Sequence, residues 1–483
     1  MASLDKTSVR SEVSRLKAEF ERLNSDGKIT GETQVLMSSM FMIIELILSI
    51  FLEKITPKNS NNSSIPPSQA PKDESALTSE GSNGKGKHDN HRLAKNTRVD
   101  NQVQLSKVTL CDVCAEDLSG VPCFSHERRT KIDIMFEKVV LHVDAEIKEC
   151  PACNATVKGA FPADMHGSLQ YGDGLKAFAV NLLVCQMVAL NRVQKLIQSI
   201  IGEVIAEATL LKFVFRLYLA LEAWELQTTE QILKAKAINV DETSLRVDKK
   251  NHWIHVYSSG DITLKFLHRK RGKEAIESIG IIPQYDGKII HDCWSSYLSY
   301  RHVGHGLCCA HLLRELTFIS ETNDYTWAQD MKHLLKETCI KVSKAREKKL
   351  SLCDLAILHR RYQDILEQGE KELPAIPPKP DGKRGKIAKS DAHNLWERLR
   401  DYQLSVLLFA KDSHVSFTNN RAERDLRMSK VKQKVSGCFR AVNYAHAYCR
   451  ISSYLQTMQN KGYNPLIAIQ MALAGQFDDI GGE

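Results

Sequence analysis

Apolar and polar residues alternate along much of the middle of the chain. Alternation with a period of two puts one face of an extended segment into a core, so it predicts β-strands. Between residues 237 and 313 the distribution of apolar residues predicts five strands and one helix. In chain order they are three strands at 237–247, 252–259 and 262–268, a helix at 273–279, and two strands at 287–294 and 306–313.

Three strands, a helix and two more strands is the order of elements in the ribonuclease-H-like α/β architecture. There the ends of the first and fourth strands lie next to each other, and a late helix approaches them. We therefore predict an α/β protein with a ribonuclease-H-like catalytic core made of residues 236–316 and 409–458. Residues 317–408 have a helical pattern and are predicted to interrupt this core as an insertion. The Pro-rich basic stretch 372–390 within them cannot be helical at its centre.

A helical period also precedes the predicted sheet. Leu, Val and Ile recur at i, i+3 and i+4 spacing and predict a helical region at residues 165–235. Residues 194–216 fit a helix-turn-helix with Gly202 near the turn. Such a pair either reads DNA or only packs within a bundle, and both interpretations stay open. At the other end of the sequence, residues 459–483 are predicted to be a C-terminal tail.

The first 55 residues carry two helical patterns. Residues 8–23 have apolar positions at helical spacing, and residues 35–52 form an apolar run. Glu45 and three serines in that run argue against a membrane span. We expect a helical segment that pairs protomers through a hairpin or coiled coil, or that packs onto its own domain. Residues 56–107, rich in Ser, Asn, Pro, Gly and Lys, are predicted to be a flexible basic linker.

Two Cys-x-x-Cys pairs lie within residues 108–160. Cys111 precedes Cys114, and Cys150 precedes Cys153. Four thiolates complete a tetrahedral Zn²⁺ site that has no open position, so the pattern predicts a structural zinc-binding domain. Redox chemistry at the two pairs is the competing interpretation.

The stretch between the two cysteine pairs has its own pattern. Residues 131–136 and 138–144 alternate, which predicts a β-hairpin that brings the pairs together. Cys123 and His126 also lie there and are spare candidate ligands, although the four cysteines already form a complete set.

Three acidic residues from distant parts of the sequence are candidate ligands of one metal site. Asp241 lies in the first predicted strand, Asp292 follows the apolar run of the fourth, and Glu423 falls in the first turn of a basic helix. A two-metal phosphoryl-transfer site needs carboxylates that hold ions roughly 3.5–4 Å apart. Each acid also has a structural interpretation. An isolated Asp caps a turn, and Glu423 fits a capping box with Asn420 or an ion pair with Arg427.

Positive charge gathers around the Glu423 helix. The net charge of +8 is moderate, but nine Lys or Arg face three acids between residues 411 and 450. Such a concentration either neutralises phosphates or forms a solvated basic face. His311 lies near the end of the fifth predicted strand and is a candidate for contact with a scissile phosphate or for a structural role. The predicted DNA-binding residues are Arg421, Arg424, Arg427, Lys430, Lys434 and Arg314.

Length and cysteine usage narrow the class of protein. With 483 residues the chain exceeds one ordinary core and should form several domains. Its 13 cysteines are an odd number and no secretory signal precedes them, which argues against a disulfide scaffold. We expect a cytoplasmic, nucleoid-associated protein.

Several motifs, taken in order, resemble those of the insertion sequence 66 family of transposases. They cover most of the chain. They are KNSNNSSIPPSQ at 58–69, the paired Cys-x-x-Cys module at 111–153, VDET at 240–243, DCWSSY at 292–297, CCAHLLREL at 308–316, NNRAERDLR at 419–427, and GCFRAVNYAHAYCRISSYLQT at 437–457. The segment after the second Asp often has small residues in this family. Here Cys293 and Trp294 stand in that place, which leaves the role of Trp294 open.

The resemblance implies a DDE transposase that cleaves and joins DNA strands with Mg²⁺ or Mn²⁺. By this resemblance, Asp241, Asp292 and Glu423 take the places of the DDE triad. It further implies terminal-inverted-repeat and target DNA, a homo-oligomer, and small accessory proteins of the same element. Two rival functions remain. One is a ribonuclease-H-like nuclease or resolvase without strand transfer, and the other is a non-catalytic, transposase-derived DNA-binding protein.

Overall fold

The computed structural model describes residues 6–26, 30, 33–34, 37–41, 43–44, 107–129, 134, 136–376 and 389–477. The chain divides into two units, one made of residues 1–71 and 141–483 and the other of residues 72–140. Most of the predicted linker 56–107 and of the Pro-rich stretch 372–390 lies outside the described residues.

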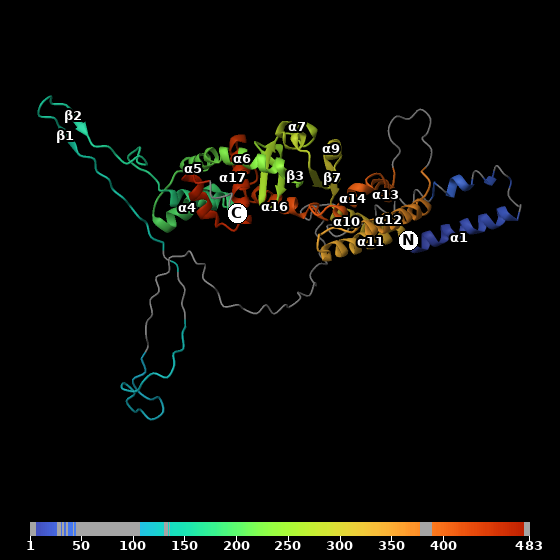
Figure 1. Ribbon diagram of the computed structural model, residues 1–483, viewed down its shortest axis with the longest axis horizontal. Coiled ribbons are helices and arrows are strands. Elements are labelled where there is room, and N and C mark those ends of the chain that lie inside the picture. The colour runs from blue at the N-terminus through green and yellow to red at the C-terminus, as the bar shows by residue number, and fades with distance from the viewer. Residues whose placement is uncertain are drawn as a thin grey trace, which may run out of the picture. The chain divides into compact units, whose positions relative to one another are not determined.

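A five-stranded mixed sheet lies at the centre of the larger unit (Figure 1). Its order is β5-β4-β3-β6-β7; β3 pairs antiparallel with β4 and β4 with β5, whereas β3–β6 and β6–β7 are parallel. The first and fourth strands in chain order, β3 and β6, are therefore neighbours in the sheet, with Asn239 level with Ile290. The strands are β3 (Ala237–Val247), β4 (Lys250–Ser259), β5 (Ile262–His268), β6 (Lys288–His291) and β7 (Gly304–Leu307).

Three of these strands and α7 (Lys273–Ile279) lie where the hydrophobic pattern predicted them, and β6 covers the first half of its predicted range 287–294. The fifth strand prediction is wrong in its extent. The strand ends at Leu307, and α10 (Cys309–Asn323) begins where residues 309–313 were expected to be extended. Cys309, Leu312 and Leu316 are all buried, so the apolar run follows a helical period that continues past the predicted strand.

Helices cover both faces of the sheet. Two helices, α16 (Asn420–Ser436) and α17 (Val442–Asn460), contribute polar partners to the face that carries Asp241, since α16 reaches β4 and β5 and α17 reaches β5. The opposite face carries Glu242, because successive strand residues point to opposite sides. There Glu242 meets Tyr297 of α9 (Ser295–Leu298). A short helix, α8 (Ile281–Gln284), follows α7.

The described residues of the predicted insertion are mainly helical, with short non-helical connections between the helices. Its helices have a core of their own, to which Ile290 of β6 and Leu307 of β7 also belong. Figure 1 shows α10 to α13 gathered into one bundle. The helices after α10 are α11 (Thr326–Lys344), α12 (Leu352–Glu372), α13 (Asp391–Asp401), α14 (Gln403–Val406) and α15 (Leu408–Lys411).

The helical region before the sheet shares one core with the sheet. It contains α3 (Asp173–Val180), the π-helical turn η1 (Asn181–Cys185), α4 (Leu190–Ile201), α5 (Glu207–Ala220) and α6 (Glu222–Lys234). Gly202 ends α4 in the left-handed conformation (φ 75°), so a helix, a turn at Gly202 and a second helix follow one another where the sequence predicted them.

The predicted C-terminal tail is partly wrong. Residues 459–483 include α18 (Pro465–Leu473), which begins with Asn464 as its N-cap and Pro465 in its first turn. Ala468, Ile469 and Ala472 are fully buried in the core shared by the sheet and the helical region. The apolar stripe of this helix therefore belongs to the fold.

The predicted hairpin between the cysteine pairs is also wrong. Residues 138–144 form no strand, and of residues 131–136 only 134 and 136 are described. Val139, Val140 and Leu141 are largely exposed, so no core stabilises an extended pair there. The hairpin instead consists of β1 (Ile147–Glu149) and β2 (Thr156–Lys158), which flank the second cysteine pair.

The N-terminal segment begins with α1 (Lys6–Ser25), where helical spacing predicted a helix. Phe20 of α1 lies against Phe41, with ring centroids 5.7 Å apart. Much of the apolar run 35–52 lies outside the described residues. Among the helices that are described, none is both long and apolar enough to cross a membrane.

Candidate carboxylate site

Two of the predicted acids lie on neighbouring parallel strands. Asp241 is the fifth residue of β3, and Asp292 follows the last residue of β6. Since Asn239 is level with Ile290, the same register brings Asp241 level with Asp292. The Asp292 carboxylate accepts the Trp294 amide at 3.1 Å, so it caps the turn that leaves β6.

The third acid comes from the first turn of α16, and Asn419 fixes where that helix begins. The side-chain amide of Asn419 donates to the Val240 carbonyl at 2.8 Å, and its oxygen accepts from Asn239 at 2.9 Å. Asn419 is 1% exposed, so these bonds replace water inside the protein. They tie the start of α16 to the part of β3 that carries Asp241.

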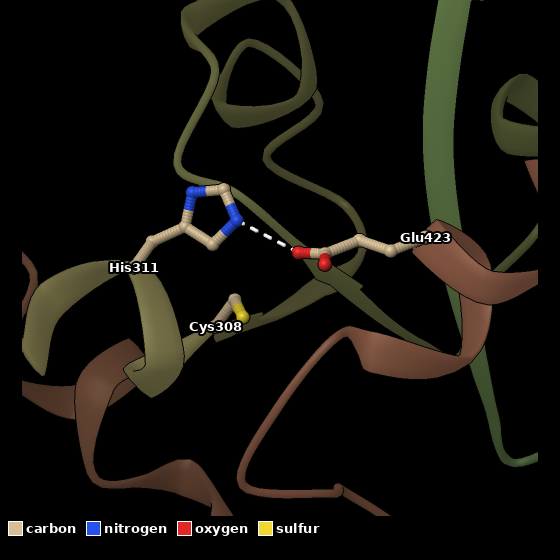
Figure 2. A group of neighbouring side chains, drawn as sticks. All are labelled: Cys308, His311 and Glu423. Carbon is tan, nitrogen blue, oxygen red and sulfur yellow. Dashed lines mark hydrogen bonds and ion pairs between the residues drawn. The ribbon is translucent and has the colours of Figure 1, made fainter. Parts of the chain in front are cut away.

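The capping interpretation of Glu423 is wrong. Asn420 is the first helical residue, and Asn419 at the cap position makes no side-chain capping bond. Glu423 accepts a hydrogen bond from His311 Nε2 at 2.8 Å (Figure 2). This bond, together with the charges of His311, Arg314 and Arg427, lowers the pKa of Glu423.

Like charge gathers around Asp241. Burial raises the pKa of this carboxyl well above its ordinary value, and the charges of Glu242, Asp292 and Glu423 raise it further. No Lys or Arg forms an ion pair with Asp241 among the residues described. Several carboxylates that repel one another in a buried place require either protons or a cation.

The donor set fits a hard divalent cation. Carboxylate oxygens are the ligands that Mg²⁺ and Mn²⁺ prefer. The three predicted acids are close enough for their charges to act on one another, but their oxygens do not form a group within 4.8 Å of one another. In the described part of the chain, the one group of three metal-ligating side chains that meets this limit is Cys308, His311 and Glu423.

A fourth acid, Glu242, was not predicted as part of the site. It is 8% exposed and bonds to Arg271 and to the Tyr297 hydroxyl, both at 2.7 Å. The Arg271 guanidinium lies over the rings of Trp294, at 4.3 Å, and Trp253, at 5.0 Å. Trp294, whose role the sequence left open, therefore packs on the arginine that neutralises Glu242. The sequence signal was the second acid of VDET.

Two further arginines lie close to the carboxylates. Arg314 follows His311 by one turn of α10, its charge acts on Glu423, and its Nε is buried without a hydrogen-bond partner among described residues. Arg398 of α13 pairs with Glu315 at 3.0 Å, and Glu315, with smaller contributions from Cys293 and Asp292, raises the pKa of Arg398 against the effect of burial. Arg398 shows that the helical insertion reaches the Asp292 end of the sheet.

The basic residues of α16 fall into two groups. Arg421 pairs with Asp425 at 3.0 Å and bonds to the Gly260 carbonyl, and Lys430 bonds to Ser244. These two side chains hold the helix to the sheet. The exposed members are Arg424, Arg427 and Lys434.

Each cysteine pair forms the same tight turn. The Cys111 amide donates to Glu116 and the Ala115 amide donates back to Cys111, both at 2.9 Å. Cys150 repeats this with Ala155 and Asn154, at 2.9 and 2.8 Å.

In each turn the fifth residue, Ala115 or Asn154, has a positive φ. Amide hydrogen bonds to sulfur lower the pKa of Cys111 and of Cys150, as a thiolate ligand requires. Cys123 lies beside His126 rather than in either turn.

These features define a mixed α/β protein with one carboxylate within β3, a second directly after the adjacent parallel strand β6, and a third contributed by a helix beyond an insertion. The model of the Transposase IS66 family matches residues 168–447, and the chain belongs to this family. The resemblance noted in the sequence is thereby confirmed, and membership implies a transposase that binds DNA. No curated protein matches the chain.

Proposed function

We propose that this transposase is a DDE enzyme with a ribonuclease-H-like core, and that Asp241, Asp292 and Glu423 hold two divalent ions, Mg²⁺ or Mn²⁺. The observation that carries the proposal is the convergence of like charge on Asp241 from Asp292 and Glu423. These acids come from β3, β6 and α16, and a buried cluster of this kind is stabilised by cations.

In this proposal Asp241 and Asp292 bind the ions directly, and Glu423 completes the shell of the second ion. When bound, the ions supply an activated water or 3′-hydroxyl and stabilise the leaving 3′ oxygen during in-line attack. His311 orients the Glu423 carboxylate through their hydrogen bond. We propose that Arg314, whose buried Nε has no hydrogen-bond partner among the described residues, binds the scissile phosphate.

DNA is proposed to lie along the exposed face of α16. Arg424, Arg427 and Lys434 recur on one side of this helix and are free to meet phosphates. Arg421 and Lys430, also predicted to bind DNA, contribute positive potential from positions where they already bond to the sheet. We further propose terminal inverted repeats and target DNA as substrates, a homo-oligomer as the active assembly, small accessory proteins as partners and the nucleoid as the place of action.

The two cysteine turns are proposed to share one structural Zn²⁺. Their donor chemistry fits, because each turn presents two thiols and the sulfur of the first, Cys111 or Cys150, receives amide hydrogen bonds. The ion would join the ends of the segment between the two pairs without taking part in the reaction.

The test is a set of charge-neutral substitutions in the proposed triad. Asp292→Asn removes the charge that both ions share, so Mg²⁺-dependent cleavage and strand transfer should fall by several orders of magnitude while folding and DNA binding persist. Asp241→Asn and Glu423→Gln should behave alike. A double variant should be hardly worse than either single one, because residues that act as a unit are not additive.

The same preparations separate the alternatives. Strand transfer by wild type on pre-cleaved DNA ends distinguishes a transposase from a nuclease that only hydrolyses. Melting temperature and strand transfer are measured on each variant. A Glu423→Gln protein that is destabilised yet active would contradict the assignment.

A further inference from the structure

Cys308, His311 and Glu423 form a compact group of three different metal-ligating side chains. Their ligand atoms all lie within 4.8 Å of one another. Figure 2 shows the three side chains converging, with Glu423 reaching from α16 toward the beginning of α10. The spacing of three residues between Cys308, at the N-cap, and His311, in the first turn, puts both on one side of α10.

The Cys308 sulfur has the surroundings of a metal ligand. Cys308 is 1% exposed, and its Sγ accepts the Asn419 amide at 3.1 Å. Burial and the charge of Glu423 raise the pKa of the Cys308 thiol, whereas the Asn419 amide hydrogen bond and the N-terminus of α10 favour the thiolate, so a bound cation would stabilise the deprotonated sulfur. The neighbouring Cys309 differs, because its Sγ contacts the Leu307 and Val406 carbonyls at 3.7 Å, away from the group.

We propose that Cys308, His311 and Glu423 bind a transition-metal cation of the zinc class, with water in the fourth position. Zn²⁺ takes sulfur at about 2.3 Å and nitrogen or oxygen at about 2.0–2.2 Å, which separates tetrahedral ligands by roughly 3.3–3.7 Å. The present separations, 2.8 Å between His311 and Glu423 and up to 4.8 Å across the group, require only side-chain rotation to reach that range.

The two proposed sites share Glu423 but select different ions. Thiolate and imidazole prefer Zn²⁺ or Co²⁺, whereas the carboxylates of Asp241 and Asp292 prefer Mg²⁺. A zinc ion held by Cys308 and His311 therefore withdraws Glu423 from the catalytic ions and inhibits strand transfer. This second step rests on the proposed DDE function, whereas zinc binding itself does not.

Zinc binding is tested on the full chain without DNA. Wild type, Cys308→Ser and the matched control Cys309→Ser are equilibrated with Zn²⁺, passed through a desalting column and analysed for metal, with melting temperature as the check on folding. Wild type and Cys309→Ser should hold about one ion per chain more than Cys308→Ser. His311→Gln is the second variant and should lose the same ion. Equal zinc contents in wild type, Cys308→Ser and His311→Gln would overturn the proposal.

Inhibition is tested by adding Zn²⁺ to strand-transfer reactions that contain Mg²⁺. The zinc concentration that halves activity, relative to the zinc-free activity of each protein, should rise at least about tenfold in Cys308→Ser and stay unchanged in Cys309→Ser, since even outer-shell changes weaken metal binding 10–100-fold. Equal sensitivity of all three proteins contradicts the inhibitory step. Wild type without any Mg²⁺-dependent strand transfer contradicts the DDE function instead, and the zinc contents then still decide the site.

Discussion

Asp241 and Glu242 are consecutive acids with opposite surroundings. Because strand residues alternate between faces, Glu242 meets Arg271 and Tyr297, whereas Asp241 faces Asp292 and Glu423. Burial raises the pKa of both carboxyls, but only Glu242 has an ion pair that opposes the rise. The strand thus separates a carboxyl that has an ion pair from one that has none among the described residues.

Acid should destabilise the fold partly through His255. This residue of β4 is 1% exposed, and burial lowers its pKa to about 4 from an ordinary value of about 6.5. Between these values the unfolded chain binds more protons, so stability should fall as pH decreases from about 6.5 to 4, by up to about 1.4 kcal/mol per pH unit. Urea unfolding of wild type and His255→Gln across this range measures the effect. Parallel pH profiles for the two proteins would rule out His255 as a source.

Individual residues were predictable to different degrees. Asp241 and Asp292 stand out because they accompany apolar strands of regular period. Asn419 does not, because its partners Asn239 and Val240 are 180 and 179 residues away in sequence. Hydrogen bonds over such separations depend on the complete fold, and no local pattern encodes them.

Among the elements, α16 depends most on contacts with a distant segment, because its first turn must stay close to β3. Asn419→Ala removes two buried side-chain bonds and leaves the Val240 carbonyl without this partner, so it should cost about 1–3 kcal/mol. Strand transfer should fall by more than the loss of folded protein alone would cause, because Glu423 shifts with the helix.

The matched control is Asn239→Ala, which removes one of these bonds. Thermal unfolding and strand transfer of both single variants and the double variant form a cycle, in which contacting residues should show a coupling of about 0.5 kcal/mol or more. Fully additive effects would argue against the anchoring role of Asn419.

We predict that the exposed basic residues of α16 make the binding of DNA salt-dependent. Replacing Arg424 and Lys434 with Gln should lower the slope of log affinity against log salt, by about 0.9 for each phosphate of duplex DNA that the protein ceases to neutralise. The exposed Lys336 and Lys344 of α11 give a control pair with the same change in net charge. An effect of equal size in the control would mean that general charge, rather than this helix, drives binding.

Elements were predictable where a single period runs through them. Strands β3 to β6 accompany apolar runs, and α7 follows a helical pattern. The boundary between β7 and α10 follows no single pattern, because CCAHLLREL satisfies a buried strand at its start and a helix over its whole length. Residues 138–144 alternate without forming a strand, since their apolar side chains are exposed.

At the scale of the whole molecule, the larger unit has two hydrophobic cores. One joins the sheet to α3–α6 and to α16–α18, and the other lies in the insertion. The sequence predicted separate domains for residues 165–235 and 236–316, but their apolar residues share one core. Local periodicity shows which residues are buried without showing which elements they are buried against.

The proposed zinc site joins two cysteine pairs that are far apart in the sequence. Cys111→Ser and Cys150→Ser should each release about one Zn²⁺ per chain, because the four thiolates act as one site. Metal analysis of the purified proteins measures this, with Cys123→Ser as the control. Zinc content that is equal in all four proteins would refute a shared site.

The insertion also has a consequence for the newly made chain. Asp292 and Glu423 are 131 residues apart, so at about 5–20 residues per second the glutamate leaves the ribosome roughly 7–26 s after the aspartate. During that interval the nascent polypeptide displays both aspartates without the third acid. Translation that stops within the insertion therefore yields a fragment without Glu423, one of the three acids that the proposed mechanism requires.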